Sequence, residues 1–521
     1  MKSLQTISRR DSTVRNNMGG TPKLHSSIIL LVLLCLAGYK SSAEKILMVP
    51  LPVFNSHWMV AASIGQALVN KGHVVTVVVE EDIVEKRRSE RPDFTFETFQ
   101  DDGFGSRLRQ FQDDVFRMAE SMSASEEFIQ HTKAADWAKK HCEHLLGGDD
   151  GDLLRRLKTA QYCVVISDPF LRCGTILAAN LGIPHVATDP GNNLNDGWFI
   201  SQMQRLENTY LVVLRNWLYA YIYDDLVRNY VSETDTIHSL TSRTDLWLHQ
   251  TDTVLNFPRP SMPNIVQVGG LTVRAGIPLS EDLEDFMQSS GDDGVIVVSF
   301  GTMVHTMSTE RKEMFAAVFA QLRQKVVWRY TGEKPACLGN NTKLMSWLPQ
   351  NDLLAHSKTR AFVNHAGLNG VYESLYHGVP MVCFPLFGDH PGNAARVVAR
   401  GLGISLDFST VTSDQLYKAV LHVLTNSSYR ETAARLSRLH RDQPQSPMEL
   451  AVWWIEHVIK HGGLPHLRAR AMELPWYQYY LLDVAAFLFG ICSAVLGTLW
   501  YSCSFVCRKV CCKRGGKIKS Q

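Results

Sequence analysis

Cysteines are scarce in the part of this 521-residue sequence that lies between its two long apolar segments. Only five are found there, and no two of them have the C-x-x-C spacing: Cys142, Cys163, Cys173, Cys337 and Cys383. Zinc sites and disulfide frameworks need paired or clustered cysteines. We therefore expect no zinc site and no disulfide framework. Cys163 and Cys383 lie in strand-like apolar runs, so we expect them to be buried, unreactive thiols.

The sequence also lacks an excess of charge, internal repeats and long low-complexity tracts. Its formal net charge is +2, which gives no reason to expect a nucleic-acid partner. No predicted strand ends in the D-x-D pair that would bring Mg²⁺ or Mn²⁺ to a diphosphate, so we expect no metal and no other cofactor. Hydrophobic residues make up 45% and charged residues 20%, which are values of a globular chain too long for one domain.

Two apolar segments interrupt this globular pattern, and the first lies near the N-terminus. Residues 27–38 have the length of a signal-peptide core, and the small residues at 41–43 suit cleavage, so we interpret residues 1–43 as a signal peptide. Met18 would start a more typical signal sequence, which makes residues 1–17 an upstream-start extension. An uncleaved anchor is the alternative.

The second apolar segment, residues 484–507, carries no charge and would form about 36 Å of helix. A basic tail at 508–521 follows it, which predicts a type I membrane protein with a cytosolic tail and lumenal domains. Lys517 and Lys519 resemble a dilysine retrieval signal, so we expect the endoplasmic reticulum membrane. The alternative is a solvated basic tail that carries no targeting signal.

Strands and helices alternate in two stretches. β-branched runs at 45–50 and 73–80 flank a helix predicted at 58–71, and such a unit implies a parallel sheet. A second series begins at 295–299, and helices between 413 and 459 are expected to return to the first. The predicted domains and their connection are 44–270, an acidic linker at 271–294, and 295–470.

The block from residue 347 to residue 393 is the most informative part of the sequence. It contains W-x-P-Q, then H-x-G-x-N-G-x-x-E after a short strand, and then H-G-V-P and P-L-F-x-D around the next strand. A glycine turn between a strand and a helix N-terminus forms an anion site. An upstream aromatic can stack on a base, and a downstream carboxylate can accept hydrogen bonds from sugar hydroxyls. The combination suits a nucleotide-sugar.

This pattern resembles the signature of the UDP-glycosyltransferases, and most closely that of the membrane-bound UDP-glucuronosyltransferases. The resemblance implies the α/β architecture called GT-B, with two doubly wound parallel-sheet domains, a cleft between them, and one C-terminal transmembrane helix. It also implies a UDP-sugar as co-substrate and a small lipophilic hydroxyl compound as acceptor. The implied donor-site residues are Ser299, Thr302, Arg329, Trp347, Gln350, His365, Gly367, Asn369, Gly370, Glu373, Asp389 and His390.

The resemblance gives these residues their expected roles. Two hydroxyls and a cation would contact the phosphates and the nucleotide, an aromatic and an amide would bind uracil, and the glycine turn would hold the diphosphate. Glu373 would accept the ribose hydroxyls, and Asp389 with His390 would contact the sugar. The reaction would be a single displacement with inversion.

Two residues of the first half are candidates for catalysis. His57 follows the first strand, and a neutral imidazole there can take a proton from an acceptor hydroxyl. Asp168 ends another strand, and a carboxylate behind an imidazole fixes its tautomer. The resembled family carries a matching S-H-W histidine as base and a matching aspartate.

Two departures from the family pattern bear on the donor sugar. Ala366 replaces the usual glycine of H-G-G, which should cost little unless the backbone there needs a positive φ. Asp389-His390 replaces the usual Asp-Gln, as in the ceramide galactosyltransferase of the same superfamily. We favour glucuronate as donor sugar, with galactose transfer to a lipid as the alternative.

Several interpretations stay open at this point. Residues 217–223 could form the wall of the acceptor pocket, a face on the membrane, or ordinary helix core. An inactive nucleotide-sugar-binding partner is the alternative to an enzyme, although the presence of both His57 and Asp168 favours the enzyme. Assembly as a homo- or hetero-oligomer with related transferases is left open. Asn340 and Asn426 lie in glycosylation sequons.

Overall fold

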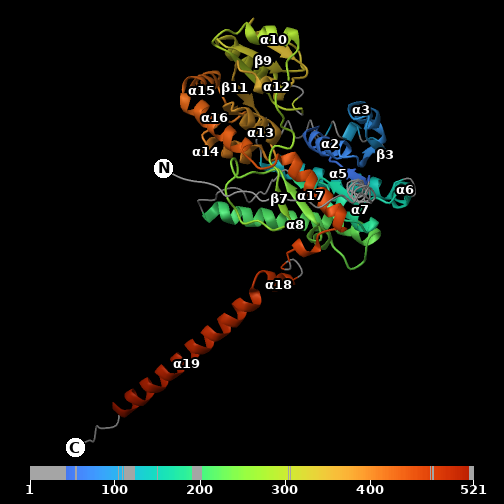
Figure 1. Ribbon diagram of the computed structural model, residues 1–521. Coiled ribbons are helices and arrows are strands. Elements are labelled where there is room, and N and C mark those ends of the chain that lie inside the picture. The colour runs from blue at the N-terminus through green and yellow to red at the C-terminus, as the bar shows by residue number, and fades with distance from the viewer. Residues whose placement is uncertain are drawn as a thin grey trace, which may run out of the picture. The chain divides into compact units, whose positions relative to one another are not determined.

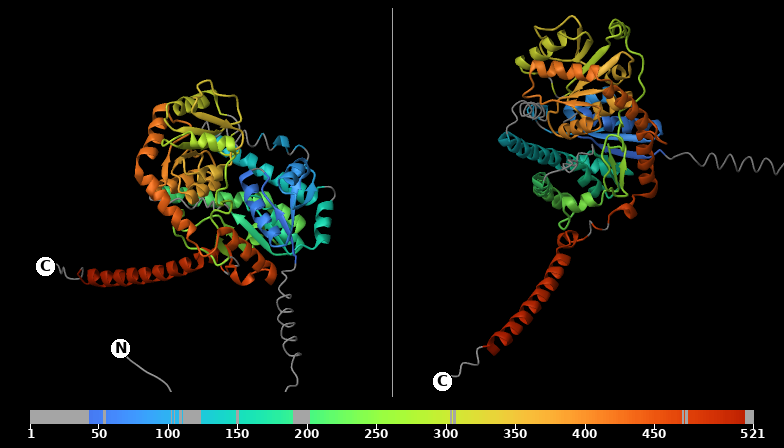
Figure 2. Two further views of the ribbon diagram at one scale, coloured as in Figure 1. Left: turned by 45° about the horizontal axis from the view of Figure 1, so that its top comes forward. Right: turned by 90° about the vertical axis from the view of Figure 1, so that its left-hand side faces the viewer.

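The computed structural model describes residues 43–514 except 53–54, 102, 104, 108–109, 111–123, 149–150, 190–201, 303, 305–306, 470 and 472–473. The expected signal peptide and the two lysines of the retrieval signal therefore lie outside the described residues. Two parallel β-sheets, one in each half of the chain, organise the rest (Figure 1). Figure 2 shows them as two bodies, with blue to green residues in one and yellow to orange residues in the other.

The first sheet has seven parallel strands in the order β3-β2-β1-β4-β5-β6-β7. Its strands are β1 (Lys45–Val49), β2 (Val74–Glu80), β3 (Thr95–Phe99), β4 (Val164–Ser167), β5 (His185–Asp189), β6 (Leu246–His249) and β7 (Ile265–Gln267). The helices among the described residues of this half are α2 (Asn55–Asn70), α3 (Val84–Glu90), α5 (Ala124–Gly147), α6 (Asp152–Ala160), α7 (Cys173–Leu181), α8 (Gln202–Tyr230) and α9 (Ile237–Ser242).

The second sheet has six parallel strands in the order β10-β9-β8-β11-β12-β13, which repeats the topology of the first. Its strands are β8 (Val295–Ser299), β9 (Lys325–Arg329), β10 (Thr342–Met345), β11 (Thr359–Asn364), β12 (Met381–Cys383) and β13 (Gly403–Ser405). Its helices are α10 (Glu281–Gln288), α11 (Thr309–Ala320), α12 (Gln350–Ala355), α13 (Leu368–His377), α14 (His390–Ala399), α15 (Ser413–Thr425) and α16 (Ser427–Arg441). The predicted pair of doubly wound parallel sheets is confirmed.

The central strands are apolar at nearly every position, so each buries both of its faces. In β1, Leu47 packs into one core of the first half and Ile46 into the other, since successive side chains point to opposite faces. Val295 and Ile296 divide in the same way between the two cores of the second half. Each fully buried side chain of this size contributes roughly 1.5–3 kcal/mol. Continuous apolar strands are therefore stable here only with helices on both faces.

Two segments differ from a simple division into consecutive halves. The expected linker at 271–294 contains α10, whose Leu283 and Met287 are buried in the second core. The helix α17 (Pro447–His461) follows the second half in sequence, yet its Val452 and Ile455 pack in a core of the first half, beside α2. This return was expected from the sequence, and Figure 1 shows α17 beside the first half.

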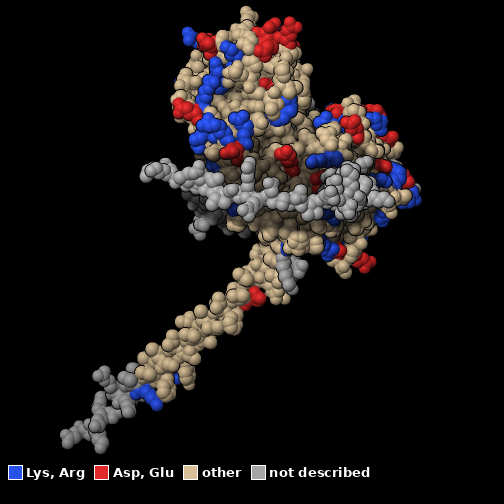
Figure 3. Space-filling model, in the orientation of Figure 1, with Lys and Arg blue, Asp and Glu red and all other residues tan. Residues whose placement is uncertain are grey.

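The chain ends with the 3₁₀ turn η4 (Pro465–Leu467), the short helix α18 (Trp476–Tyr479) and the long helix α19 (Leu482–Arg514). Within the described residues, α19 is the one helix long and apolar enough to cross a membrane, over Leu482–Lys509 with a mean hydropathy of 2.0. Its surface is free of Lys, Arg, Asp and Glu over most of its length (Figure 3). The helix fits the predicted C-terminal membrane anchor.

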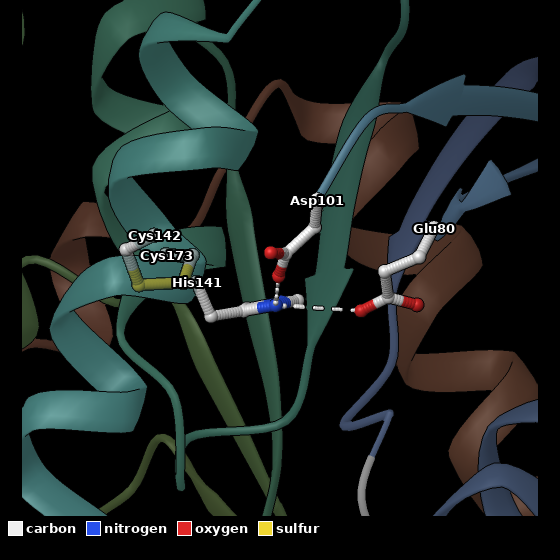
Figure 4. Close-up of a disulfide and its surroundings, with 5 residues drawn as sticks. All are labelled: Glu80, Asp101, His141, Cys142 and Cys173. Atoms are coloured by element: carbon white, nitrogen blue, oxygen red, sulfur yellow. Dashed lines mark ion pairs between the residues drawn. A yellow bond between two sulfur atoms is a disulfide. The ribbon is translucent and has the colours of Figure 1, made fainter. Parts of the chain in front are cut away.

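The described residues contain one disulfide, which the sequence did not predict, although no disulfide framework was expected. Cys142 of α5 and Cys173 of α7 are joined, with 5.3 Å between their Cα atoms (Figure 4). Their separation of 31 residues has no motif, and only the packing of α5 against α7 brings them together. Of the thiols expected to be buried, Cys383 is buried, which raises its pKa to about 12, whereas Cys163 is only half-buried.

Candidate active site

Both halves place their chemistry at the point where the strand order reverses. In the first sheet this point lies between β1 and β4, and in the second between β8 and β11. The helices that follow the two neighbouring strands pack on opposite faces of the sheet, so a crevice opens between them at the carboxyl ends of the strands. His57 and Asp168 follow β1 and β4, and Ser299 and His365 lie at the ends of β8 and β11.

The side chains of His57 and Asp168 contact each other directly. The Nδ1 atom of His57 lies 2.5 Å from Asp168 Oδ2, although the residues are 111 positions apart. The other carboxylate oxygen of Asp168 accepts a hydrogen bond from the backbone N–H of Phe170, at 2.9 Å. Asp168 is therefore held from two sides and fixes the orientation of the imidazole.

The electrostatic surroundings of His57 favour its protonated form. Burial by itself lowers the pKa of His57, but the Asp168 charge, the Asp168 hydrogen bond and the charges of Asp389 and Asp189 together raise it above its usual value. The imidazole is thus a stronger base than a free histidine, which suits a group that accepts a proton from a hydroxyl.

The donor side is built around the imidazole of His365. A Cβ atom at Gly301 or at Gly367 would lie 2.6 or 2.5 Å from its Nε2 atom, so both positions must be glycine for the ring to fit. Gly301 also has a φ of 77°. Burial, and secondly the neighbouring His390, lower the pKa of His365 to about 3, so this ring stays neutral.

A cation and an aromatic ring lie next to this turn. Arg329, at the end of β9, donates a hydrogen bond to the carbonyl of Gly301. Its guanidinium carbon lies 5.9 Å from the ring centroid of Trp347, and that ring is 57% exposed. An exposed indole beside a fixed cation can stack on a planar base.

The amide of Gln350 and the carboxylate of Glu373 form a second pair. Gln350 Nε2 donates to Glu373 Oε2 at 2.5 Å, from the first residue of α12 to the first turns of α13. Burial raises the pKa of Glu373 to about 7, against the opposing effects of Gln350 and Arg274. The protonation of this carboxyl group therefore changes near neutral pH.

The Asp389-His390 pair lies at the start of α14 and is held by its surroundings. Asn393 Nδ2 donates to Asp389 Oδ2 at 2.6 Å. The backbone N–H of Phe387 donates to His390 Nδ1 at 3.3 Å, so the remaining ring nitrogen, Nε2, is the one available as a donor. The imidazole of His390 packs edge-on against that of His365, with 4.7 Å between centroids. Burial lowers the pKa of His390 to about 3.

A cleft of about 1030 Å³ joins these groups, and residues of both halves line it. Asn369 of α13 donates to the carbonyl of Ser56, beside His57, at 3.2 Å. Asp168 does not line the cleft but lies behind His57. The cleft is lined by His57 and by every residue expected at the donor site, namely Ser299, Thr302, Arg329, Trp347, Gln350, His365, Gly367, Asn369, Gly370, Glu373, Asp389 and His390.

Comparison with known proteins assigns this arrangement to a family. A family model described as UDP-glucoronosyl and UDP-glucosyl transferase matches residues 44–194 and 193–517. The chain belongs to this family. It is similar to UDP-glucuronosyltransferase 2A3 of Mus musculus, with 36% identity over 94% of this chain and 97% of that enzyme. UDP-glucuronosyltransferase 1A1 of Homo sapiens is 34% identical over 96% of this chain and 98% of that enzyme.

Solved structures give the same fold. The glycotransferase of kitacinnamycin has a TM-score of 0.58 and covers 81% of this chain and all of its own, at 20% identity. A UDP-glucosyltransferase from Polygonum tinctorium has a TM-score of 0.57 and covers 80% of this chain and 99% of its own, at 15% identity. The chain is thus a GT-B enzyme that transfers a glycosyl group from a UDP-sugar.

Two local features of this UDP-glycosyltransferase differ from expectation. His57 belongs to the first turn of α2, which begins at Asn55 instead of the predicted residue 58. Ala366 has a φ of 60°, so the backbone there does need a positive φ, at a cost of about 1 kcal/mol for a residue with a Cβ. Its N–H donates to Asn364 Oδ1 at 2.6 Å, which holds the turn.

The sequence reasoning missed several polar residues in the acceptor half of the cleft. Asp189 and His249 end β5 and β6, and His249 Nε2 lies 3.2 Å from Asp189 Oδ2. The rule that selected Asp168, a polar residue at the carboxyl end of a parallel strand, would have found both. Arg172 also lines the cleft, but no pattern in the sequence marks it.

The aromatic run at 217–223 in α8 serves more than one surface. Tyr219 lines the cleft, Tyr223 is buried in the first core, and Trp217 and Tyr221 are exposed. The pocket-wall interpretation therefore holds for one face of the helix and the core interpretation for another. The two exposed rings stack on each other, with 5.7 Å between centroids.

The two sequon asparagines differ in their surroundings. Asn340 is exposed in a turn. Asn426 is half-buried at the N-cap of α16, and its Oδ1 accepts a hydrogen bond from the backbone N–H of Ser428 at 3.1 Å. Asn340 is the more accessible of the two. In the part of the chain that the structure describes, no group of three His, Cys, Asp or Glu side chains could hold a metal ion.

Proposed function

We propose that this enzyme transfers a glucuronosyl group from UDP-glucuronate to the hydroxyl of a small lipophilic acceptor. The observation that carries the proposal is the His57–Asp168 pair at the edge of a cleft lined by all the expected UDP-sugar contacts. The names of the relatives, which are UDP-glucuronosyltransferases, support glucuronate as the sugar.

In the proposed mechanism, the acceptor oxygen attacks the anomeric carbon as the bond to the UDP oxygen breaks, with inversion. His57 Nε2 takes the hydroxyl proton, because Nδ1 is engaged by Asp168. The Asp168 carboxylate stabilises the imidazolium that forms. The backbone and side chains at the start of α13, with Arg329, stabilise the leaving diphosphate, and no metal takes part.

We place the enzyme in the endoplasmic reticulum membrane, with its two domains in the lumen. The apolar helix α19 and the basic residues after it support this orientation. The Cys142–Cys173 disulfide supports it independently, because disulfides persist in oxidising compartments. Protease added to sealed microsomes should then remove only the tail, and a glycan on Asn340 should be lost in Asn340→Gln. Digestion of either domain without detergent would contradict this orientation.

Galactose transfer to a lipid is the second candidate, and His390 is the observation that favours it. With Nδ1 occupied by the Phe387 amide, His390 offers the sugar a donor through Nε2, whereas glutamine offers a donor and an acceptor side by side. The two side chains therefore present different hydrogen-bonding groups to the hexose.

A donor panel decides between these candidates. Microsomes that contain the protein receive a small phenol with UDP-glucuronate, UDP-galactose, UDP-glucose or UDP-N-acetylglucosamine, with and without chelator. We expect the highest rate with UDP-glucuronate and no effect of chelator. If galactose is preferred, His390→Gln should shift the ranking toward glucuronate or glucose. An unchanged ranking would remove His390 from donor choice, and absence of transfer from any donor would favour an inactive nucleotide-sugar-binding partner.

A further inference from the structure

The acceptor half of the cleft contains a cation that the proposed mechanism does not use. Arg172 lies at the N-cap of α7, four residues after Asp168, and lines the cleft. Four residues of chain reach at most ~14 Å, so Arg172 belongs to the neighbourhood of the catalytic pair.

Two aromatic rings hold the guanidinium in place. Its central carbon lies 5.1 Å from the ring centroid of Tyr219 and 5.8 Å from that of Trp247. Both rings line the cleft, one from α8 and one from β6. Aromatic faces attract a cation but leave its N–H groups, which lie in the guanidinium plane, without acceptors.

The charge of Arg172 is not neutralised by the described residues. None of their carboxylates forms an ion pair with it, and its Nη1 atom is buried without a hydrogen-bond partner. The nearby cleft carboxylates are engaged elsewhere. Asp189 contacts His249, and Asp224 Oδ1 accepts from the backbone N–H of Ile237 at 2.8 Å. A partly buried charge whose Nη1 atom has no partner is unfavourable, and a bound anion would offset that cost.

We propose that Arg172 is the anion-binding subsite of the acceptor pocket, and that the preferred acceptors carry a carboxylate in addition to the hydroxyl that reacts at His57. This inference rests on the proposed function and names a substrate class for it. The carboxylate would bind the guanidinium between Tyr219 and Trp247, and the apolar body of the acceptor would lie toward Pro169 and Phe170.

The carboxylate of the donor glucuronate is the other anion that could reach this cleft. The expected donor contacts, from Ser299 to His390, all lie in the second half, whereas Arg172 and both of its aromatic neighbours lie in the first. This division assigns Arg172 to the acceptor.

Matched acceptors test the assignment in membranes that contain the full-length chain. The pair is 3-(4-hydroxyphenyl)propanoate, which is anionic, and 4-propylphenol, which is neutral and of similar size. In Arg172→Gln, the KM for the anionic phenol should rise roughly 10-fold or more relative to that for the neutral phenol. Arg172→Lys should lose less, because it keeps the charge without the planar fork. Arg155→Gln, on the exposed face of α6, is the control and should not change the ratio.

Three results would overturn the inference. One is an equal loss with both phenols, which a purely structural role would give. The second is an unchanged ratio. The third is a rise in the KM for UDP-glucuronate but not for UDP-glucose with the neutral phenol, which would assign Arg172 to the donor carboxylate.

Failure of the proposed function can be told apart from failure of this inference. If the wild-type protein transfers no sugar to either phenol, the proposed function is wrong. Calorimetric titration of both phenols into wild-type and Arg172→Gln protein then decides the subsite, which requires a selective loss of binding by the anionic phenol.

Discussion

The two halves of this protein share one sheet topology but carry their functional residues in different ways. In the second half, a block of fewer than 50 residues supplies most of the proposed donor contacts, and the contacts from this block lie on the turns and helices after β10, β11 and β12. In the first half, the residues that line the cleft come mainly from α2, from the turn after β4, from α8 and α9, and from β5, β6 and β7. The proposed donor contacts are close together in the sequence. The cleft-lining residues of the first half are far apart in the sequence and are brought together only by folding.

The difference follows from what each half is proposed to bind. A nucleotide diphosphate has fixed charges and a fixed shape, so a strand, a glycine turn and a helix N-terminus bind it in a standard way. An acceptor pocket has no such standard solution, and its walls come from whichever helices cover the sheet. The proposed chemistry of the first half therefore depends on one close pair, His57 and Asp168. The other residues of its pocket follow no fixed pattern.

Removal of the base should distinguish the roles of the two halves most clearly, because it should affect turnover but not UDP binding. We expect His57→Ala to reduce kcat by roughly 10³-fold or more, because general-base assistance is lost. Binding of UDP should stay at the wild-type level, since His57 belongs to the acceptor half. Turnover and calorimetric titration with UDP measure the two effects. Wild-type turnover in this variant would refute the assignment of the base.

Removal of the disulfide should destabilise the first half alone. The double variant Cys142→Ala/Cys173→Ala opens a loop of 31 residues, so the free energy of unfolding should fall by about 4 kcal/mol. Cys337→Ala, which removes an exposed free thiol of the second half, is the matched control. Hydrogen exchange resolved by peptide should detect faster exchange in α5 and α7. Equal destabilisation of both halves would mean that they unfold as one unit.

Loss of the carboxylate behind His57 should change both rate and pH dependence. Asp168 raises the pKa of His57, and the base acts in its neutral form, so activity falls as the pH drops through that pKa. In Asp168→Asn we expect kcat to fall about 10²-fold and the acidic limb of the pH profile to move to lower pH. A limb that stays in place would show that another group titrates there.

The donor half should have its own, smaller pH dependence. The pKa of Glu373 is raised to about 7, so its carboxyl group is mostly ionised at pH 8 and mostly protonated at pH 6. An ionised carboxylate accepts hydrogen bonds from both ribose hydroxyls, so the KM for the UDP-sugar should rise a few-fold as the pH falls across this range. Glu373→Gln should flatten this dependence, and a steep profile in that variant would exclude Glu373 as its source.

The sequence predicted the contiguous half of the site better than the scattered half. The parallel strands, the turn at His365 to Gly370 and the return of α17 could be predicted because each depends on local periodicity and short motifs. The Cys142–Cys173 pair could not, because it depends on how α5 packs against α7. Arg172 gave no signal either, since its importance lies in the rings of Tyr219 and Trp247, 47 and 75 positions later in the chain.

The position of α17 determines which half the C-terminal helix is attached to. The chain crosses between the halves twice, once before α10 and once before α17. After α17, the backbone N–H of Leu464 and the guanidinium of Arg468 bind Asp245 of the first half, at 2.9 and 2.7 Å. The membrane helix that follows is thus attached to the acceptor half. If the helix is anchored in a bilayer as proposed, the first half is the one held next to the membrane, and the second half is connected to the anchor only through the first.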